Sequence, residues 1–225
     1  MKIIAHIRTD FKEKFGIPRQ SGILEECPGR VVFLPEYRSP EALRGIEGYS
    51  HLWLIWEFSE AKRESWSPTV RPPRLGGNRR VGVFATRAPY RPNPIGLSSV
   101  KLIGIEEREG EGLTLLVSGA DMLDGTPIYD IKPYLSYTDS HPDAVGGFSD
   151  AVRDYSVKVD ISPELLGRVE PSKQKVLIGM LEGDPRPQYK KDGDAEYGLR
   201  YADYEIKFTV DGGVLTVKDI IVMKP

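Results

Sequence analysis

Short apolar runs bounded by glycine and proline recur through the N-terminal part of this 225-residue chain. They predict strands at residues 2–9, 30–34, 50–58, 97–105 and 113–118. The run SHLWLIWEF at 50–58 is apolar at most positions, which is typical of a central strand that is buried on much of its surface. The last two runs are joined by the charged turn EEREGEG and are expected to form a hairpin.

Helical signals are sparse before residue 140. Ser39-Pro40-Glu41 is typical of a helix start, with Ser39 as the N-cap and Pro40 in the first turn of a short helix. Many short strands with one short helix favour a closed or nearly closed β-barrel over a doubly wound α/β domain. The sequence has no G-x-G-x-x-G motif after a strand and no G-x-x-x-x-G-K-[ST] loop, so we expect no Rossmann-type cofactor site.

The pattern changes after the polar connector HPDAVGGFSD. Helices are predicted at 162–166 and 172–181, followed by strands at 203–210 and 214–222 that are joined by Asp211-Gly212-Gly213. We therefore predict a mainly β chain with two domains. Residues 1–140 would form an N-terminal β-barrel of a non-Rossmann type, and residues 141–225 a small C-terminal α+β domain.

Composition indicates a globular protein, since 40% of the residues are hydrophobic. There is no apolar run of about 18 residues, and the N-terminus MKIIAHIRTD is charged too early for a secretory signal. We expect a cytoplasmic protein without a membrane segment. Cys27 is the single cysteine, and the three histidines show no metal-ligand spacing, so no metal site is expected.

Positive charge is concentrated in one segment. Nine basic residues and one acidic residue lie between Lys62 and Lys101, although the net charge of the chain is −2. The centre of this segment, RPPRLGGNRRVGVFATRAPYRPNPIGL at 71–97, places arginines on backbone stiffened by proline around a predicted packed strand of Val81, Val83 and Phe84. Such a concentrated field favours a polyanion or nucleic-acid site, with a solvated charged face as the alternative.

Three further segments carry candidate polar groups. Lys14, Arg19 and Gln20 lie on a loop that could help to grip an anion. The aspartates of GADMLDGTPIYDIKPY at 119–134 are too few and too irregularly spaced for a calcium loop, whereas Asp124 and Thr126 in a rigid turn could bind a small polar ligand. The stiff loop DPRPQY presents Arg186 and Tyr189, which are suited either to stacking on a base and binding phosphate or to an ordinary structural role.

These motifs closely resemble the TsaA-like, or TrmO, family. The segments KFGIPRQSG (14–22), EGYSHLWLIWEF (47–58), RPPRLGGNRRVGVFATRAPYRPNPIGLSSVKL (71–102), DMLDGTPIYDIKPY (121–134) and DPRPQY (184–189) follow one another in the family's order. Ala88 and Tyr90 depart from the serine and phenylalanine of the family pattern, but both approximately keep the size of the side chain.

The resemblance implies a β-barrel methyltransferase that uses S-adenosylmethionine and works as a homodimer, with the methyl donor near the subunit interface. Its implied substrate is tRNA that carries threonylcarbamoyl-adenosine beside the anticodon, and the methyl group would go to the exocyclic nitrogen of that base. Two alternatives stay open: a non-catalytic RNA-binding barrel, and a methyltransferase that acts on a small molecule rather than on tRNA.

On this resemblance we assign the site residues from the most family-like motifs. The donor site is expected to contain Arg87, Arg91, Asn93, Pro94, Leu97, Asp124 and Thr126. Arg87 or Arg91 would meet the donor's carboxylate or a tRNA phosphate, Asn93 would orient a polar edge, and the Asp124 turn would bind the adenosine or the amine.

The acceptor N–H must lose its proton during the reaction. Residues with suitable side chains for this step are Asp130, Tyr129 and His51, and water is the remaining option. The tRNA anticodon arm is expected to lie along Arg71, Arg74, Arg79 and Arg80, with Arg186 and Tyr189 reaching a second part of it.

Overall fold

The computed structural model describes residues 1–61, 65–72, 75, 79–186 and 193–223. Arg74 and Tyr189, both expected to contact tRNA, lie outside these described residues.

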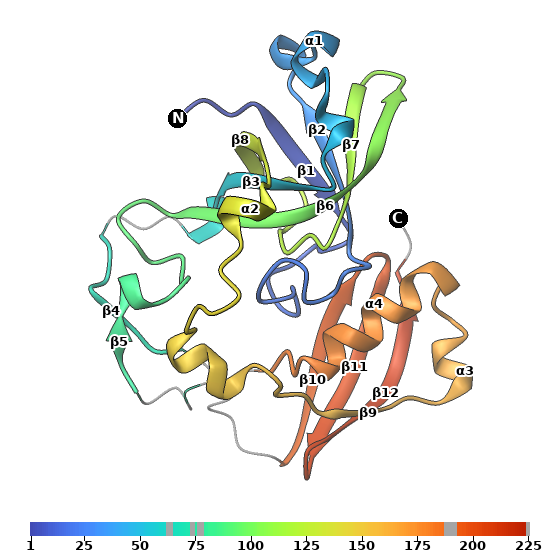
Figure 1. Ribbon diagram of the computed structural model, residues 1–225. Coiled ribbons are helices and arrows are strands. Elements are labelled where there is room, and N and C mark those ends of the chain that lie inside the picture. Colours follow the sequence, from blue (N-terminus) through green and yellow to red (C-terminus); the bar gives the residue numbers. More distant parts are fainter. Residues whose placement is uncertain (62–64, 73–74, 76–78, 187–192, 224–225) are drawn as a thin grey trace.

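Six antiparallel strands of the N-terminal part pair in a closed ring (Figure 1). Their order around the ring is β1-β2-β7-β6-β3-β8, and β8 closes it by pairing with β1. The strands are β1 (Ala5–Thr9), β2 (Pro28–Phe33), β3 (His51–Glu57), β6 (Ile95–Arg108), β7 (Gly112–Ser118) and β8 (Pro127–Pro133). The predicted hairpin is the pair β6 and β7, which the structure confirms.

Alternation along β3 explains how the ring is filled. Leu52, Leu54 and Trp56 point into a buried cluster, whereas Trp53 and Ile55 lie half-buried on the outer face. The sequence of this strand therefore looks uniformly apolar because its outer face also carries large hydrophobic side chains. The other buried members of the ring core are Ala5, Ile7, Val31, Phe33, Leu43, Val100, Leu115, Val117, Ala120, Met122 and Ile128.

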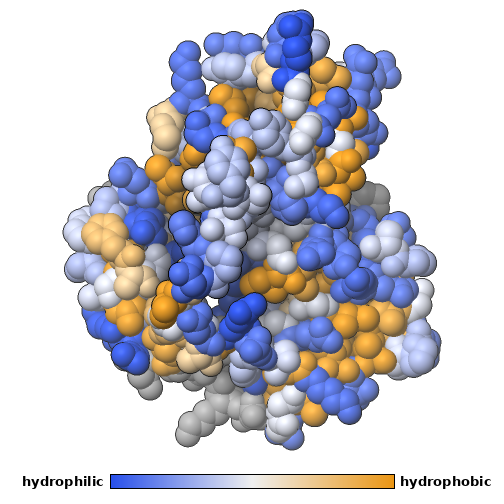
Figure 2. All heavy atoms as spheres, viewed as in Figure 1, coloured by the Kyte–Doolittle hydropathy of each residue, from blue (hydrophilic) through white to orange (hydrophobic). Residues whose placement is uncertain are grey.

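A small hairpin lies beside the ring, between β3 and β6 in the chain. It pairs β4 (Thr69–Val70) with β5 (Val81–Gly82) and continues into the 3-10 turn η5 (Val83–Ala85). The predicted packed strand through Phe84 is wrong, because the chain turns after Gly82 and the Phe84 side chain is 71% exposed. In Figure 2, hydrophobic atoms lie among hydrophilic ones on the left of the molecule, where Figure 1 places this hairpin.

The remaining short elements connect the larger ones. They are the helices α1 (Pro40–Leu43) and α2 (Ser136–Asp139) and the 3-10 turns η1 (Pro35–Tyr37), η2 (Ile46–Gly48), η3 (Ser59–Ala61) and η6 (Gly147–Val152). The predicted helix after Ser39 is confirmed, but the Ser39 side chain makes no capping hydrogen bond.

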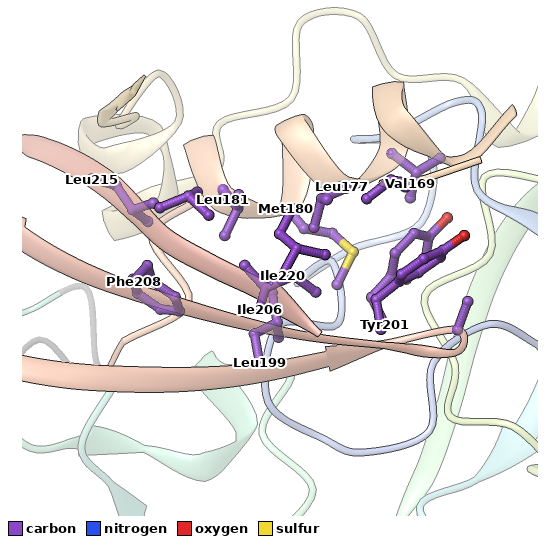
Figure 3. Packing of buried hydrophobic residues seen from close by; sticks show 14 of the residues in the cluster. Val169, Leu177, Met180, Leu181, Leu199, Tyr201, Ile206, Phe208, Leu215 and Ile220 are labelled. Atoms are coloured by element: carbon purple, nitrogen blue, oxygen red, sulfur yellow. The ribbon is translucent and has the colours of Figure 1, made fainter. Parts of the chain in front are cut away.

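The C-terminal part is a four-stranded sheet with one face covered by a helix. The strand order is β10-β11-β12-β9, in which β9 is parallel to β12. The helix α4 (Pro171–Glu182) presents Leu177, Met180 and Leu181 to the strand side chains (Figure 3). The elements are β9 (Lys158–Asp160), α3 (Pro163–Leu166), β10 (Gly193–Tyr201), β11 (Tyr204–Asp211) and β12 (Val214–Val222).

The predicted helices and the β11–β12 hairpin are confirmed, whereas β8, β9 and β10 were not predicted as strands. β8 has the sequence PIYDIKP, and its two prolines and its aspartate favour a turn when the segment is considered alone. In the ring it lies between β1 and β3, which supply the pairing that its sequence does not signal.

The segment between β1 and β2 packs on the core of the C-terminal sheet. Phe11 and Cys27, at its two ends, are buried in that core, and Phe15, Ile17 and Leu24 pack against it. Burial raises the pKa of the Cys27 thiol to about 12, which keeps the sulfur protonated and apolar in character. Residues 11–27 therefore join the ring to the C-terminal core.

Gly16 allows the closest approach in this packing. A β-carbon at this position would lie 2.2 Å from Cδ1 of Leu199, and the backbone φ is +88°. We expect Gly16→Ala to lower the free energy of unfolding by overpacking, which costs roughly 1–3 kcal/mol, in addition to the strain of a positive φ.

Gly22→Ala is the matched control, because Gly22 has a similar φ of +76° but nothing within 4 Å of the added carbon. Denaturant unfolding of both variants measures the difference. Equal losses of stability would mean that the contact with Leu199 does not fix the segment.

Candidate functional site

A cavity of about 740 Å³ lies where four separate segments of the chain meet. The segments are the loop at 14–20, the end of β3 with the turn η3, the stretch at 86–97 and the turn before β8. Its lining mixes aromatic and aliphatic walls with charges of both signs, as is usual for small-molecule sites. The lining residues are Lys14, Ile17, Pro18, Arg19, Gln20, Trp56, Glu57, Phe58, Ser59, Glu60, Ala61, Thr86, Arg87, Pro89, Tyr90, Arg91, Asn93, Ile95, Gly96, Leu97, Asp121, Leu123 and Thr126.

Two polar contacts connect the 14–20 loop to the opposite walls. Lys14 Nζ donates to the backbone oxygen of Glu60 at 2.8 Å and forms an ion pair with its carboxylate at 3.2 Å. Arg87 donates from Nη1 to Oε1 of Gln20. Both contacts are exposed, so each contributes little to stability, and they join the 14–20 loop to the η3 turn and to the 86–97 stretch.

Asp121 places a carboxylate in the lining and is held by the buried Ser98, which in turn is held by Trp56. Ser98 Oγ donates to Asp121 Oδ1 at 2.6 Å, and Trp56 Nε1 donates to Ser98 Oγ at 2.9 Å. Burial raises the pKa of Asp121 to about 6, and hydrogen bonds from Ser98 and the backbone at Ser21, with the charge of Arg87, offset part of the rise. The group therefore changes charge just below neutral pH.

The position of the Trp56 ring depends on a glycine. Gly96 faces Trp56 across the β3–β6 pair, and a β-carbon there would lie 2.2 Å from the indole. The missing side chain lets the ring lie flat against β6 and reach Ser98. Sequence reasoning assigned no role to this glycine, to Trp56 or to Asp121.

Five of the seven predicted donor-site residues line the cavity: Arg87, Arg91, Asn93, Leu97 and Thr126. Arg91 is partly engaged by its own loop, because Nη1 donates to the oxygens of Thr86 at 2.9 Å and Ala88 at 3.3 Å. The Thr126 hydroxyl donates to the oxygen of Leu123 at 2.7 Å, which leaves its oxygen able to accept.

The other two predicted donor-site residues, Pro94 and Asp124, do not line the cavity. The oxygen of Pro94 accepts the backbone N–H of Phe58 at 2.9 Å. The Asp124 carboxylate accepts from the backbone N–H of Thr9 at 3.0 Å and pairs with Lys12 at 3.0 Å. Asp124 thus ties the turn to β1 and its following loop, and Asp121 is the carboxylate of this turn that faces the cavity.

The three predicted proton acceptors also lie outside the lining. His51 is at the opposite end of β3 from Glu57, where its ring contacts the hydroxyl of Ser50 and the ring of Tyr134. Asp130 pairs with Lys132 at 3.2 Å on the surface. Burial and the neighbouring carboxylate of Glu57 raise the pKa of Tyr129 to about 12, so the phenol keeps its proton at neutral pH.

Glu57 is a carboxylate of the lining that contacts one of these three residues, Tyr129. It lines the cavity at the end of β3, and Tyr129 forms a side-chain hydrogen bond with it. Since the phenol stays protonated, it donates and the carboxylate accepts. The sequence had shown only that Glu57 bounds an apolar run.

Of the residues predicted to contact tRNA, the three described arginines of the basic segment are exposed. Arg71 follows β4, and Arg79 and Arg80 precede β5, so they gather at one end of the small hairpin.

The prediction for Arg186 is wrong as a surface contact, because this side chain is buried and its Nε donates to Asp184 Oδ1 at 2.9 Å. Tyr155 donates to the other oxygen of Asp184 at 2.8 Å.

In the ranges that the structure describes, no three His, Cys, Asp or Glu side chains gather in a way that could hold a metal ion. Over the same residues, no helix combines the length and the apolar character that a membrane span requires.

Comparison with known proteins identifies the family of the chain. The family model for the tRNA-methyltransferase O N-terminal domain matches residues 6–140, and the TrmO C-terminal domain model matches residues 154–222. The chain belongs to the tRNA-methyltransferase O family. This membership confirms the resemblance seen in its motifs and makes the chain a member of a family of enzymes.

Relatives of known name cover most of the chain. A "tRNA (adenine(37)-N6)-methyltransferase" of Escherichia coli is 38% identical over 217 residues, which are 92% of this chain and 91% of that protein. A Pseudomonas aeruginosa relative, 41% identical over 211 residues (90% of this chain, 89% of that protein), is named in the class of S-adenosylmethionine-dependent methyltransferases. A crystal structure of TrmO from P. aeruginosa superposes with a TM-score of 0.78 and 35% identity, covering 98% of this chain and 95% of that one. The mainly β class is thereby confirmed.

Replacing Asp121 by asparagine tests the electrostatic state of the cavity. Because the folded pKa of about 6 is raised above the ordinary 3.8, the folded protein holds this proton more tightly, and stability falls as the pH rises from about 4 to about 6. Asp121→Asn keeps an oxygen for Ser98 and removes the ionisation. As the pH rises from 4 to 7, the free energy of unfolding of the variant should increase relative to that of the wild type by on the order of 1–3 kcal/mol.

Urea unfolding at several pH values measures this gain. Asp130→Asn serves as the control, because Asp130 lies outside the cavity and its side chain is 49% exposed. A stability difference between Asp121→Asn and wild type that stays constant with pH would contradict the raised pKa.

Proposed function

We propose that the protein transfers the methyl group of S-adenosylmethionine to the exocyclic nitrogen of the adenine beside the anticodon of tRNA, in molecules where that base carries threonylcarbamoyl. The observation that carries the proposal is the cavity, in which guanidinium and carboxylate groups face apolar walls in a chain of the tRNA-methyltransferase O family. The threonylcarbamoyl group is the more specific part of the proposal and rests on the resemblance of the motifs.

The residues of the cavity fit the chemical parts of the donor. Its volume of about 740 Å³ lies within the usual range for sites of drug-sized ligands. Arg87, at the exposed side of the cavity, is suited to the carboxylate of the amino-acid tail, and the carboxylate of Asp121 to a cationic group of the donor. Trp56, Phe58 and Leu97 supply apolar walls for the adenine.

Bound S-adenosylmethionine supplies an electrophilic methyl carbon on a sulfonium leaving group. The chain itself has mainly to orient the acceptor nitrogen, since correct alignment can contribute about 7–11 kcal/mol to lowering the barrier. The stretch at 86–97 is suited to this task, because its prolines and the hydrogen bonds of Arg91 to Thr86 and Ala88 limit its motion.

Glu57 is our candidate for accepting the proton of the acceptor nitrogen. It is a carboxylate of the lining, in contrast to Asp130, Tyr129 and His51. The hydrogen bond with Tyr129 would hold the carboxylate in one orientation at the wall of the cavity.

The two parts of the chain would divide the work. We propose that residues 1–140 hold the donor and the reacting base, with Arg71, Arg79 and Arg80 along the path of the tRNA anticodon arm in the cytoplasm. Residues 141–225 would support the 14–20 loop and add tRNA contacts other than Arg186, which is buried.

A homodimer is the proposed assembly. Ile103 and Leu97 project from the outer face of β6 and are 57% and 54% exposed, and Ile95 lies on the same face. Burying these side chains against a second copy would remove apolar surface from water beside the cavity, because Ile95 and Leu97 also belong to its lining.

A methyl-transfer assay tests the proposed reaction. We expect purified protein to transfer labelled methyl groups from S-adenosylmethionine to tRNA from cells that make threonylcarbamoyl-adenosine, and not to tRNA from cells that lack this modification. Equal transfer to both would leave tRNA methylation standing and contradict the threonylcarbamoyl specificity. Thermal stabilisation by S-adenosylmethionine without any transfer to tRNA would favour a small-molecule methyltransferase, and absence of stabilisation would favour a non-catalytic RNA-binding protein.

Two arginine variants separate donor binding from RNA binding. Removing a charge-assisted hydrogen bond costs about 1.5–3 kcal/mol, so Arg87→Ala should weaken donor binding roughly 10- to 150-fold in calorimetry. Arg80→Ala, outside the lining, should leave donor affinity unchanged, weaken tRNA binding and reduce its salt dependence. The assignment of Arg87 would be wrong if both variants bound the donor equally well and kept the thermal stability of the wild type.

A further inference from the structure

Two aromatic side chains stack on the surface next to the cavity without being part of a core. The rings of Trp66 and Phe84 lie 6.0 Å apart between centroids at an interplanar angle of 24°. Trp66 is 48% exposed and Phe84 is 71% exposed. Large aromatic surface that stays in water in this way is more typical of a binding surface than of a structural contact.

One arginine lies against this pair, and three more are exposed on the adjoining hairpin. The guanidinium carbon of Arg91 lies 6.0 Å from the centre of the Phe84 ring, within the range of a cation–π interaction. Arg71, Arg79 and Arg80 are exposed on the hairpin that separates Trp66 from Phe84 in the chain. An apolar protein partner would gain little from this setting, whereas a stacked base next to its phosphates would use both the rings and the charges.

The pair is joined to the cavity through short contacts. Arg91 contacts Phe84 and also lines the cavity. The backbone N–H of Ser67, next to Trp66, donates to the oxygen of Tyr90 at 3.3 Å, and Val83 N–H donates to Pro68 O at 3.0 Å. The rings are therefore held next to the 86–97 wall. When the base of one nucleotide enters the cavity, a neighbouring nucleotide of the same strand could reach the rings.

We propose that Trp66 and Phe84 form a stacking platform for an unpaired nucleobase of the RNA substrate, close in sequence to the base that is methylated. The inference deepens the proposed function and rests on it. The platform would bind through the faces of the rings, so it would accept more than one base, and it would hold the RNA strand while the reacting base occupies the cavity.

Variants that remove or keep the ring face test the platform. Loss of stacking on one base weakens binding roughly 5- to 150-fold, so Trp66→Leu and Phe84→Leu should raise the KM for an anticodon stem-loop RNA by a factor in this range. Trp66→Phe and Phe84→Tyr keep an aromatic ring, so their KM for the stem-loop should stay close to the wild-type value. Donor affinity and the rate at saturating RNA should change little in all four variants.

Tyr137→Leu is the matched control, because Tyr137 is an aromatic residue that is 85% exposed on α2 and lies outside the pair. A series of stem-loop RNAs, each lacking the base at a different position, should identify the nucleotide that stacks on the platform. Removing its base should raise the KM of the wild-type protein and leave the KM of Phe84→Leu unchanged. Quenching of tryptophan fluorescence by the stem-loop should decrease in Trp66→Phe.

The platform would be overturned if the wild-type protein methylates the stem-loop and both leucine variants have the same KM for it as the wild type. If the wild-type protein transferred no methyl group to any tRNA, the proposed function itself would fail. Direct binding of the stem-loop to the leucine variants would then still decide the platform, because equal affinity of the variants and the wild type would exclude it.

Discussion

Hydrophobic packing of the 11–27 segment against the C-terminal sheet is the constraint on which the cavity depends. Phe11 and Cys27 fix the two ends of the segment in that core, and Gly16 lets it approach Leu199. The same segment carries Arg19 and Gln20 to the cavity. The C-terminal part therefore shapes the proposed donor site through packing. None of its residues that the structure describes belongs to the lining of the cavity.

Charge in the cavity follows from how deeply each group is buried. Asp121 lies deep enough for its pKa to rise to about 6, although it accepts a hydrogen bond from Ser98 and feels the charge of Arg87. Arg87 lies at the exposed side, where solvent screens it. An anionic group near an apolar wall and cationic groups near the opening suit a ligand that carries both charges, such as an amino-acid tail.

The basic segment serves two places in the structure. Its part before β5 is exposed at the end of the small hairpin, and its part after the η5 turn forms a wall of the cavity. Phe84 and Arg91 stand at the junction, one on the surface and one in the lining. Closeness of these two places would allow one RNA strand to be held outside while a single base is presented inside.

The sequence by itself determined the family, the mainly β class, the β6–β7 and β11–β12 hairpins and most of the 86–97 wall. These features can be predicted because their signals, which are apolar periodicity, turn glycines and the residue sequence of each motif, lie within short stretches of the chain. Only the tertiary structure decided which carboxylates face the cavity. Asp121 and Asp124 occur in one turn with similar local surroundings, and they differ because Lys12 and Thr9 bind one while Ser98 binds the other. In the same way, the burial of Arg186 follows from long-range packing, which residue type and spacing do not record.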